Sequence, residues 1–269
     1  MNTLFLRLEG PLQAWGLRAR WGERDTADAP TKSGVIGLLG CALGYRRDDA
    51  RLRELGDALR MGVRVDLPGT LLHDYHTTGG GRYGEAVHTG GSRFHDEPYA
   101  GGVLSAEVVK GRIKVKINAS TKEPETDVST RTYLADASFL AALQGESEQV
   151  AALAEALQNP VWPYFLGRKS CVPATPVYAA VGQHKRLEDA LVSPLFSPRV
   201  LTAWERRRPE ALRLLLEALP GEGNRQSDNI GVPARRLFHP RYVREAWFAP
   251  PAEGRSDPEG GLTINTLEG

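Results

Sequence analysis

The hydrophobic and polar positions of the chain change period several times, and each change predicts a structural element. Apolar and polar residues alternate from Thr3 to Leu8, which predicts an opening β-strand. Small apolar residues and recurrent glycines follow over 28–44 and predict a helix that begins near Lys32 and ends at Gly44. Leucines then recur on one face over 48–62, which predicts an amphipathic second helix.

The remaining periodic segments lie on either side of a glycine-rich insertion. Short strands are predicted at 63–67 and 70–77, and residues 77–102 have no period and many glycines, as a functional or disordered loop would. Alternation around Gly111 predicts a β-hairpin within 103–120, after which core-like sequence returns. Helical or strand periods recur in three later segments, namely helices at 148–157 and 209–219 and a strand at 241–248. The order strand, helix, strands, insertion, strand, helix, strand predicts an α+β fold of the ferredoxin-like type.

The overall composition is that of an ordinary globular protein and narrows the function little. The chain has 269 residues, of which 41% are hydrophobic and 25% charged, with a formal net charge of +1. Such a small net charge creates no overall positive field that would attract a polyanion. Any nucleic-acid site must therefore be a local concentration of lysine and arginine side chains. The first ten residues lack the apolar run of a signal peptide, and the two cysteines, Cys41 and Cys171, fit reduced buried thiols. We expect a cytoplasmic protein with no membrane segment.

Basic residues collect in three stretches despite the balanced total. Residues 18–47 hold six bases against three acids, 161–186 hold four bases and no acid, and 224–244 hold five arginines against one aspartate. Aromatic residues interleave these stretches, and the mixture of cations and flat rings is what a groove for single-stranded nucleic acid requires. The alternative interpretation is an ordinary solvated surface, which is where most Lys and Arg residues lie.

The start of the first predicted helix is a candidate phosphate site. A helix N-terminus presents unpaired backbone N–H groups, and Lys32 and Ser33 add a cation and a hydroxyl there. The glycines that follow, from Gly34 on, would let a phosphate backbone approach or would simply allow tight packing of the helix. The Lys-Ser pair precedes the glycines, so the segment is not a Walker P-loop.

The chain shows no established catalytic motif. Four histidines, His73, His76, His88 and His95, lie within 23 residues, but no cysteine accompanies them and their spacing is not that of a zinc site. Tyr75, His76 and Lys32 are the side chains from which metal-independent RNA cleavage could be built. Because nothing in the sequence brings them together, we expect a binding protein without metal or cofactor.

Five segments together resemble a known family. They are "LRLEGPLQAWG" (6–16), "PTKSGVIGLLGCALG" (30–44), "DYHT" (74–77), "TYLADASF" (132–139) and "FLGRKSCVP" (165–173). In this order they resemble the CasD family, the type I-E Cascade subunits of the CRISPR RAMP superfamily. The resemblance covers the first two-thirds of the chain and is weaker after Pro173.

The resemblance implies a ferredoxin-like palm with a β-hairpin thumb. On this chain the palm maps to 1–77 and 131–250, the thumb insertion to 78–130, and a flexible tail to 251–269. It further implies a non-catalytic subunit that binds the five-prime handle of the CRISPR RNA (crRNA) and caps the backbone filament. The implied partners are the adjacent backbone subunit, the large subunit that recognises the PAM and, indirectly, target DNA.

The charge pattern and the resemblance together predict a set of RNA-binding residues. Phosphate contacts are expected at the helix start and in two basic loops, base contacts at the root of the thumb, and further contacts along the thumb. In chain order these residues are Arg24, Lys32, Ser33, Gly34, Tyr75, His76, Arg82, Arg93, Lys114, Arg131, Arg168 and Lys169. The competing hypotheses are a metal-independent endoribonuclease that processes the repeat RNA, and an interaction subunit whose bases meet an acidic protein.

Overall fold

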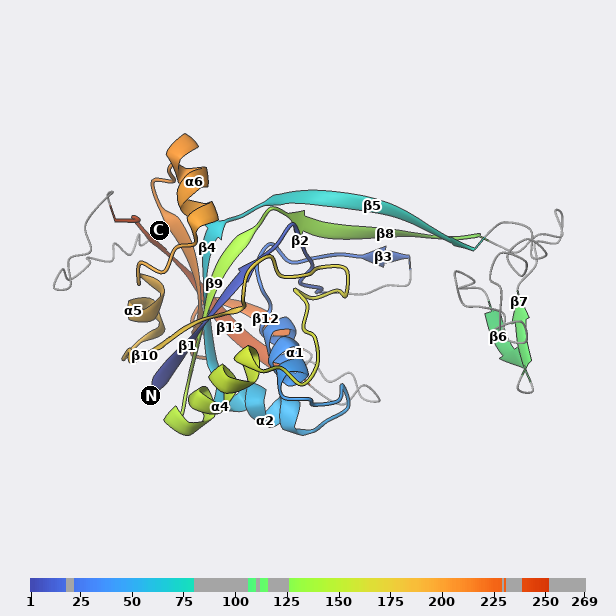
Figure 1. The fold of residues 1–269 in the computed structure, drawn as a ribbon, viewed down its shortest axis with the longest axis horizontal. Helices are drawn as coiled ribbons and strands as arrows, with labels where there is room; N and C mark the ends of the chain where they lie inside the picture. The colour runs from blue at the N-terminus through green and yellow to red at the C-terminus, as the bar shows by residue number, and fades with distance from the viewer. Residues whose placement is uncertain are drawn as a thin grey trace. The chain divides into compact units, whose positions relative to one another are not determined.

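The structure is a computed structural model that describes residues 1–17, 22–79, 106–109, 112–115, 126–228, 230 and 239–251. The chain divides into two compact units (Figure 1). Unit 1 comprises residues 1–17, 25–72 and 133–269, and unit 2 comprises residues 18–24 and 73–132.

Unit 1 is built on a seven-stranded sheet in which every neighbouring pair is antiparallel. From one edge to the other, its strands are β10 (Tyr178–Gly182), β1 (Asn2–Glu9), β9 (Ser138–Gly145), β4 (Arg60–Leu67), β11 (Leu212–Ala218), β13 (His239–Phe248) and β12 (Asn224–Asp228). A short strand, β2 (Leu12–Gln13), follows β1 and pairs with the last two residues of β8 (Thr126–Ala135).

Helices cover both faces of this sheet. On one face lie α1 (Lys32–Ala42), α2 (Arg51–Ala58) and α4 (Ser147–Gln158), and on the other α5 (Leu187–Leu191) and α6 (Pro198–Arg206). Strand β1 shows why both faces are apolar, because Leu4, Leu6 and Leu8 join the first core while Phe5 joins the second. The predicted α+β class is confirmed, and the ferredoxin-like subclass stays a prediction.

Two predicted helices are wrong in part or in full. The amphipathic helix expected over 48–62 is shorter, because Arg60 already begins β4, whose six residues 61–66 are all buried in the sheet. The helix expected over 209–219 is strand β11. Its leucines fit either period, but Leu212, Leu214 and Leu216 are buried and the residues between them only half-buried, as in a strand with one face in the core.

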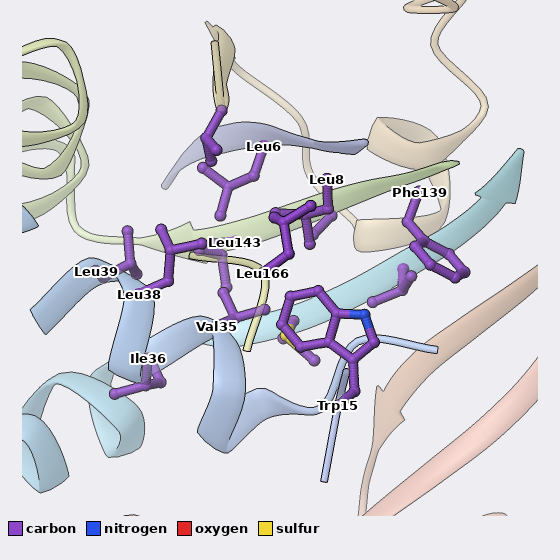
Figure 2. Packing of buried hydrophobic residues seen from close by; sticks show 14 of the residues in the cluster. Leu6, Leu8, Trp15, Val35, Ile36, Leu38, Leu39, Phe139, Leu143 and Leu166 are labelled. Atoms are coloured by element: carbon purple, nitrogen blue, oxygen red, sulfur yellow. The ribbon is translucent and has the colours of Figure 1, made fainter. Parts of the chain in front are cut away.

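Helix α1 uses its glycines for close packing. Thr31 caps its first turn by accepting a hydrogen bond from the Gly34 N–H at 3.3 Å. A Cβ on Gly34 would lie 2.8 Å from the indole ring of the buried Trp15, and a Cβ on Gly40 would meet Leu52 of α2. Gly37 faces open space, and Gly44 ends the helix with a φ of +72°, as predicted for this position. Figure 2 shows Trp15 among the apolar side chains of α1 and the sheet.

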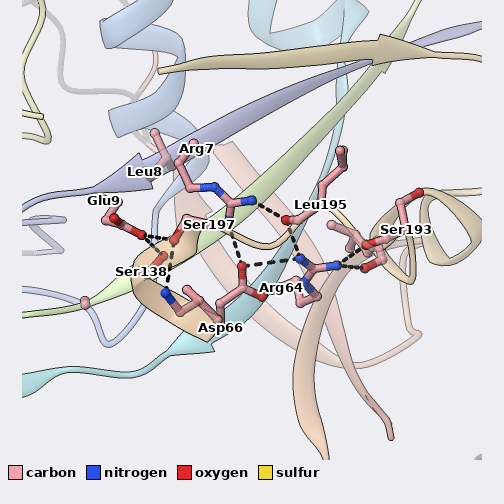
Figure 3. A network of polar contacts seen from close by, with 12 residues as sticks. Arg7, Leu8, Glu9, Arg64, Asp66, Ser138, Ser193, Leu195 and Ser197 are labelled. Atoms are coloured by element: carbon pink, nitrogen blue, oxygen red, sulfur yellow. Dashed lines mark hydrogen bonds and ion pairs between the residues drawn. The ribbon is translucent and has the colours of Figure 1, made fainter. Parts of the chain in front are cut away.

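A buried ionic network joins the other face of the sheet to the loop before α6 (Figure 3). Asp66 on β4 binds the guanidinium groups of Arg7 at 2.7 Å and Arg64 at 2.5 Å. Arg64 is fully buried and also donates to the carbonyl oxygens of Leu191, Ser193 and Leu195. Since two cations share one carboxylate, these carbonyl oxygens supply the remaining acceptors that buried guanidinium groups require. The network therefore fixes the path of residues 191–195.

A second buried carboxylate positions the start of α6. Glu9 accepts hydrogen bonds from Ser138 and from Ser197, each at 2.7 Å. The Ser197 hydroxyl in turn accepts from the Val200 N–H and caps α6. The residues of β1, β9 and α6 are thus linked through one side chain.

Unit 2 contains two small sheets. Strand β8 pairs with β5 (Thr70–Gly79) and, in parallel, with β3 (Glu23–Arg24). Strands β6 (Ala106–Val109) and β7 (Arg112–Val115) pair with each other in antiparallel register, which confirms the hairpin predicted around Gly111.

The glycines of α1 provide a matched test of this packing. We expect Gly34→Ala to lower the free energy of unfolding by about 1–3 kcal/mol, because the new methyl group overlaps Trp15. Gly37→Ala should instead raise it by up to about 1 kcal/mol, because the position is open and alanine favours the helix. Urea unfolding of both variants measures the difference, and equal effects would contradict the packing.

Candidate nucleic-acid interface

In unit 1, the loop that carries Arg168 and Lys169 is held against the residues around Trp15. The Ala14 N–H donates to the Leu166 carbonyl at 3.0 Å. Gly167 has a φ of +95°, and a Cβ there would lie 1.8 Å from the Ala14 carbonyl oxygen. No other residue type fits this backbone without displacing the loop. The glycine therefore determines the position of the two basic side chains, Arg168 and Lys169.

Arg168 and Lys169 occupy different environments on this loop. The Arg168 guanidinium lies over the ring of Tyr133, 4.6 Å from its centroid, and donates to the Asp25 carbonyl oxygen at 3.3 Å. These contacts orient a half-buried cation, while Lys169 is exposed. The pair thus combines an oriented guanidinium group with an exposed ammonium group, both of which suit phosphate groups.

The two cysteines are free thiols, as predicted. Cys171, at the end of this loop, is buried, and Cys41 is half-buried. Burial raises the pKa of both thiols, so each stays protonated and poorly nucleophilic at neutral pH.

Lys32 lies in an ion pair inside unit 1. Its ammonium group is 2.9 Å from the Glu217 carboxylate on β11, and its side chain is only 7% exposed. Glu217 also accepts from the Met61 N–H at 2.9 Å, so one carboxylate joins α1, β4 and β11. Ser33 is half-buried beside Thr31, with its hydroxyl 3.5 Å from that of Thr31. The phosphate contacts predicted for Lys32, Ser33 and Gly34 stay predictions.

A pocket of about 440 Å³ opens beside Lys32. The pocket-lining cations are Lys32, Arg53 and Arg241, and each pairs with a lining carboxylate, respectively Glu217, Asp57 and Asp228. A pocket whose cations are neutralised in this way has little surplus attraction for a phosphate.

In unit 2, Arg24 and Arg131 lie side by side. They are register partners on the parallel strands β3 and β8, so both side chains leave the same face of the sheet. Arg24 is exposed, and the half-buried Arg131 has an Nε without a hydrogen-bond partner among the described residues. Two adjacent guanidinium groups concentrate positive charge on this face, which suits a phosphate group.

Tyr75 and His76 leave opposite faces of β5, because successive side chains of a strand alternate. Tyr75 is 70% exposed and shares its face with His73, whose Nδ1 is 3.2 Å from the Thr132 hydroxyl. His76 lies 3.9 Å from Asp74 on the other face. The two side chains therefore project from opposite faces of β5, and Tyr75 is the more exposed of the two.

Three of the predicted thumb residues have side chains outside the described part of the chain. Arg82 and Arg93 lie outside the described residues, and so does the side chain of Lys114, whose backbone belongs to β7. Within the described part of the chain, no three His, Cys, Asp or Glu side chains are grouped as metal ligands. In the same residues, no helix has the length and apolar character of a membrane span.

Comparison with known proteins decides the family. The family model described as CRISPR-associated protein (Cas_Cas5) matches residues 3–250. The chain belongs to this Cas5 family. A curated relative in Escherichia coli (strain K12), the CRISPR system Cascade subunit CasD, is 33% identical over 204 residues, which are 71% of this chain and 76% of the relative.

Two solved structures resemble this Cas5 family member over nearly its whole length. A chain of a CRISPR RNA-guided surveillance complex has a TM-score of 0.66 and 29% identity, and the match covers 93% of this chain and 91% of that one. The crystal structure of a Cas protein has a TM-score of 0.60 and 34% identity, with 92% and 95% covered. The predicted family resemblance is thereby confirmed.

Several residues that shape the candidate interface of this Cas5 family member were not predicted from sequence. Tyr133 and the Asp25 carbonyl orient Arg168, and Gly167 fixes the loop. Only Gly167 left a signal, as the glycine directly before the Arg-Lys pair. The partners of Arg168 are distant in sequence and have no common motif.

The ion pair of Lys32 predicts a structural defect rather than a simple loss of binding. Lys32→Ala should lower the free energy of unfolding by about 1–3 kcal/mol, since it leaves the Glu217 carboxylate without its cation. Lys169→Ala removes an exposed charge and should stay within about 0.5 kcal/mol of the wild type. Thermal unfolding of both variants tests this, and a wild-type Tm for Lys32→Ala would contradict it.

Proposed function

We propose that this chain is a crRNA-binding subunit of a type I-E Cascade complex and that it holds the five-prime repeat handle. The observation that carries the proposal is the 33% identity to the E. coli Cascade subunit over 71% of the chain, together with the likeness to a chain of an RNA-guided complex. The adjacent backbone subunit, the large PAM-recognising subunit and, indirectly, target DNA are the partners we propose from the same likeness.

The contacts of unit 1 support RNA binding through the loop that follows Gly167. Arg168 is oriented by a ring and a carbonyl oxygen, so it loses little conformational entropy when it meets a phosphate. Lys169 adds an exposed charge beside it. We leave Lys32 out of the direct contacts, because its ammonium group already neutralises Glu217.

The contacts of unit 2 support a second point of attachment. Arg24 and Arg131 form an adjacent pair of guanidinium groups, and Tyr75 exposes most of its ring. Phosphate contacts position an RNA, whereas stacking on an aromatic ring holds an unpaired base. We accordingly propose that an unpaired nucleobase of the handle stacks on Tyr75.

We propose that the subunit is not catalytic. A metal-independent nuclease needs a base and an acid on the same scissile phosphate. Of the three side chains from which such a site could be built, Tyr75 and His76 project from opposite faces of β5, and the Lys32 ammonium group is paired with Glu217.

A gel experiment separates binding from cleavage. Purified full-length protein is incubated with labelled repeat RNA in EDTA and resolved on native and denaturing gels. We expect a shifted band that remains uncut. A discrete shorter product would favour the nuclease, and no shift at low salt would contradict RNA binding by the subunit.

Charge variants test the proposed contacts in the same assay. Lys169→Gln should weaken binding to all RNA sequences and reduce the slope of log Kd against log salt concentration by about 0.7, the loss of one phosphate contact. Arg206→Gln, in which an exposed arginine at the end of α6 loses its charge, serves as the matched control. Equal slopes for the two variants would contradict the role of Lys169.

A further inference from the structure

A cluster of cations lies on the α5 face of the sheet in unit 1, and it contains none of the residues in the predicted RNA-binding set. Arg244 on β13 and Arg186, directly before α5, both donate to the same carboxylate oxygen of Glu188. The Arg186 contact measures 3.1 Å. Two guanidinium groups therefore share one acceptor atom, and the cluster has a net positive charge.

The two arginine side chains of the cluster are more exposed than the carboxylate, so the excess positive charge lies on the solvent side. The Glu188 side chain is 11% exposed, whereas those of Arg244 and Arg186 are 32% and 65% exposed. Partial burial, and secondly the charge of Arg186, lower the pKa of Arg244. A further anion beside the two guanidinium groups would relieve this repulsion.

The strand register extends the cluster along β13. Arg244 lies opposite the buried Leu216, so its side chain projects on the α5 side of the sheet. Tyr242 is two residues away on the same strand, and its side chain projects on the same side. Arg225 on β12 is the register partner of Tyr242 and is exposed. A half-buried ring thus lies between one exposed guanidinium and the Arg186–Arg244 pair.

The net charge of this surface stays positive when the charged residues on α5 and in the two positions before it are counted. Lys185 and Asp189 are both exposed. The bases of the surface are Lys185, Arg186, Arg225 and Arg244, and its acids are Glu188 and Asp189.

We propose that these four basic side chains and Tyr242, together called the Arg186–Arg244 surface, form a second binding site for single-stranded nucleic acid. Phosphates lie on the guanidinium groups, and one nucleobase stacks on the Tyr242 ring. A row of cations that flanks an aromatic ring matches the alternating phosphates and bases of a single strand. An acidic protein segment would use the cations but would leave the ring without a stacking partner. The site goes beyond the proposed function, because it shares no residue with the proposed handle contacts.

The test compares two double variants of the full-length protein. Arg186→Gln with Arg225→Gln removes two exposed cations of the surface, while Arg244 remains to pair Glu188. Arg206→Gln with Arg207→Gln removes two exposed cations at the end of α6 and is the charge-matched control. Binding of 20-nucleotide polyuridine and of oligo-dT is measured over a salt series, and equal Tm values verify that the variants are folded.

We expect the slope of log Kd against log salt concentration to fall by about 0.7 for each contact removed in the first variant, and to stay unchanged in the control. A photo-crosslink from 4-thiouridine to the peptide that contains Tyr242 would support the stacking position. If the first variant has the same slopes as the control with both nucleic-acid probes, the site is overturned. Polyglutamate represents an acidic protein segment, and a loss of affinity for it with unchanged nucleic-acid slopes would also overturn the site. If only this variant behaves as the control while Lys169→Gln loses repeat-RNA binding, the surface fails and the proposed function stands.

Discussion

The packing of Trp15 is the contact on which the candidate interface of unit 1 depends. Its indole fills the space that Gly34 leaves open on α1, and its Nε1 donates to the side-chain oxygen of Gln13 at 3.1 Å. Gln13 donates in turn to the carbonyl oxygens of Leu8 and Ala137, so the segment after β1 is fixed to the sheet. The Trp15 carbonyl accepts from the Ala27 N–H, and neighbouring Ala14 holds the loop with Arg168. The buried ring and the backbone of residues 14–15 thus contact α1, the segment before it and a basic loop.

The cations of this protein have two different uses, which burial and pairing distinguish. Arg7, Arg64 and Lys32 are buried and bound to Asp66 or Glu217, and breaking such a pair costs more than the pair itself contributes. Their role is to position α1, β4, β11 and the loop before α6. Arg168 is only partly buried and Lys169 is exposed, so a phosphate can reach both side chains from solvent.

Much of the fold could be predicted because local patterns determined it. The sequence of strand β1 alternates clearly, Gly44 ends α1 with a positive φ, and β6 and β7 pair in antiparallel register as a hairpin requires. Strand β11 was mistaken for a helix because a leucine-rich run satisfies both periods, and only burial against α5 and α6 decides between them.

The candidate site could be predicted less completely, because its contacts are distant in sequence. Lys32 was correctly placed at a helix start, but its partner Glu217 is 185 residues away. The basic stretch 161–186 was correctly noted, yet it contains both the Arg168 loop and Arg186, which lie against different partners. Neither the ring beneath Arg168 nor the register that joins Arg24 to Arg131 follows from spacing along the chain.

The most direct test of RNA binding at these positions is amide hydrogen exchange of the full-length protein with and without repeat RNA. We expect RNA to slow exchange in residues 164–171, around the oriented Arg168, and in residues 22–24 and 130–132, around the Arg24–Arg131 pair. Binding of the RNA with unchanged exchange in all three segments would contradict the proposed interface.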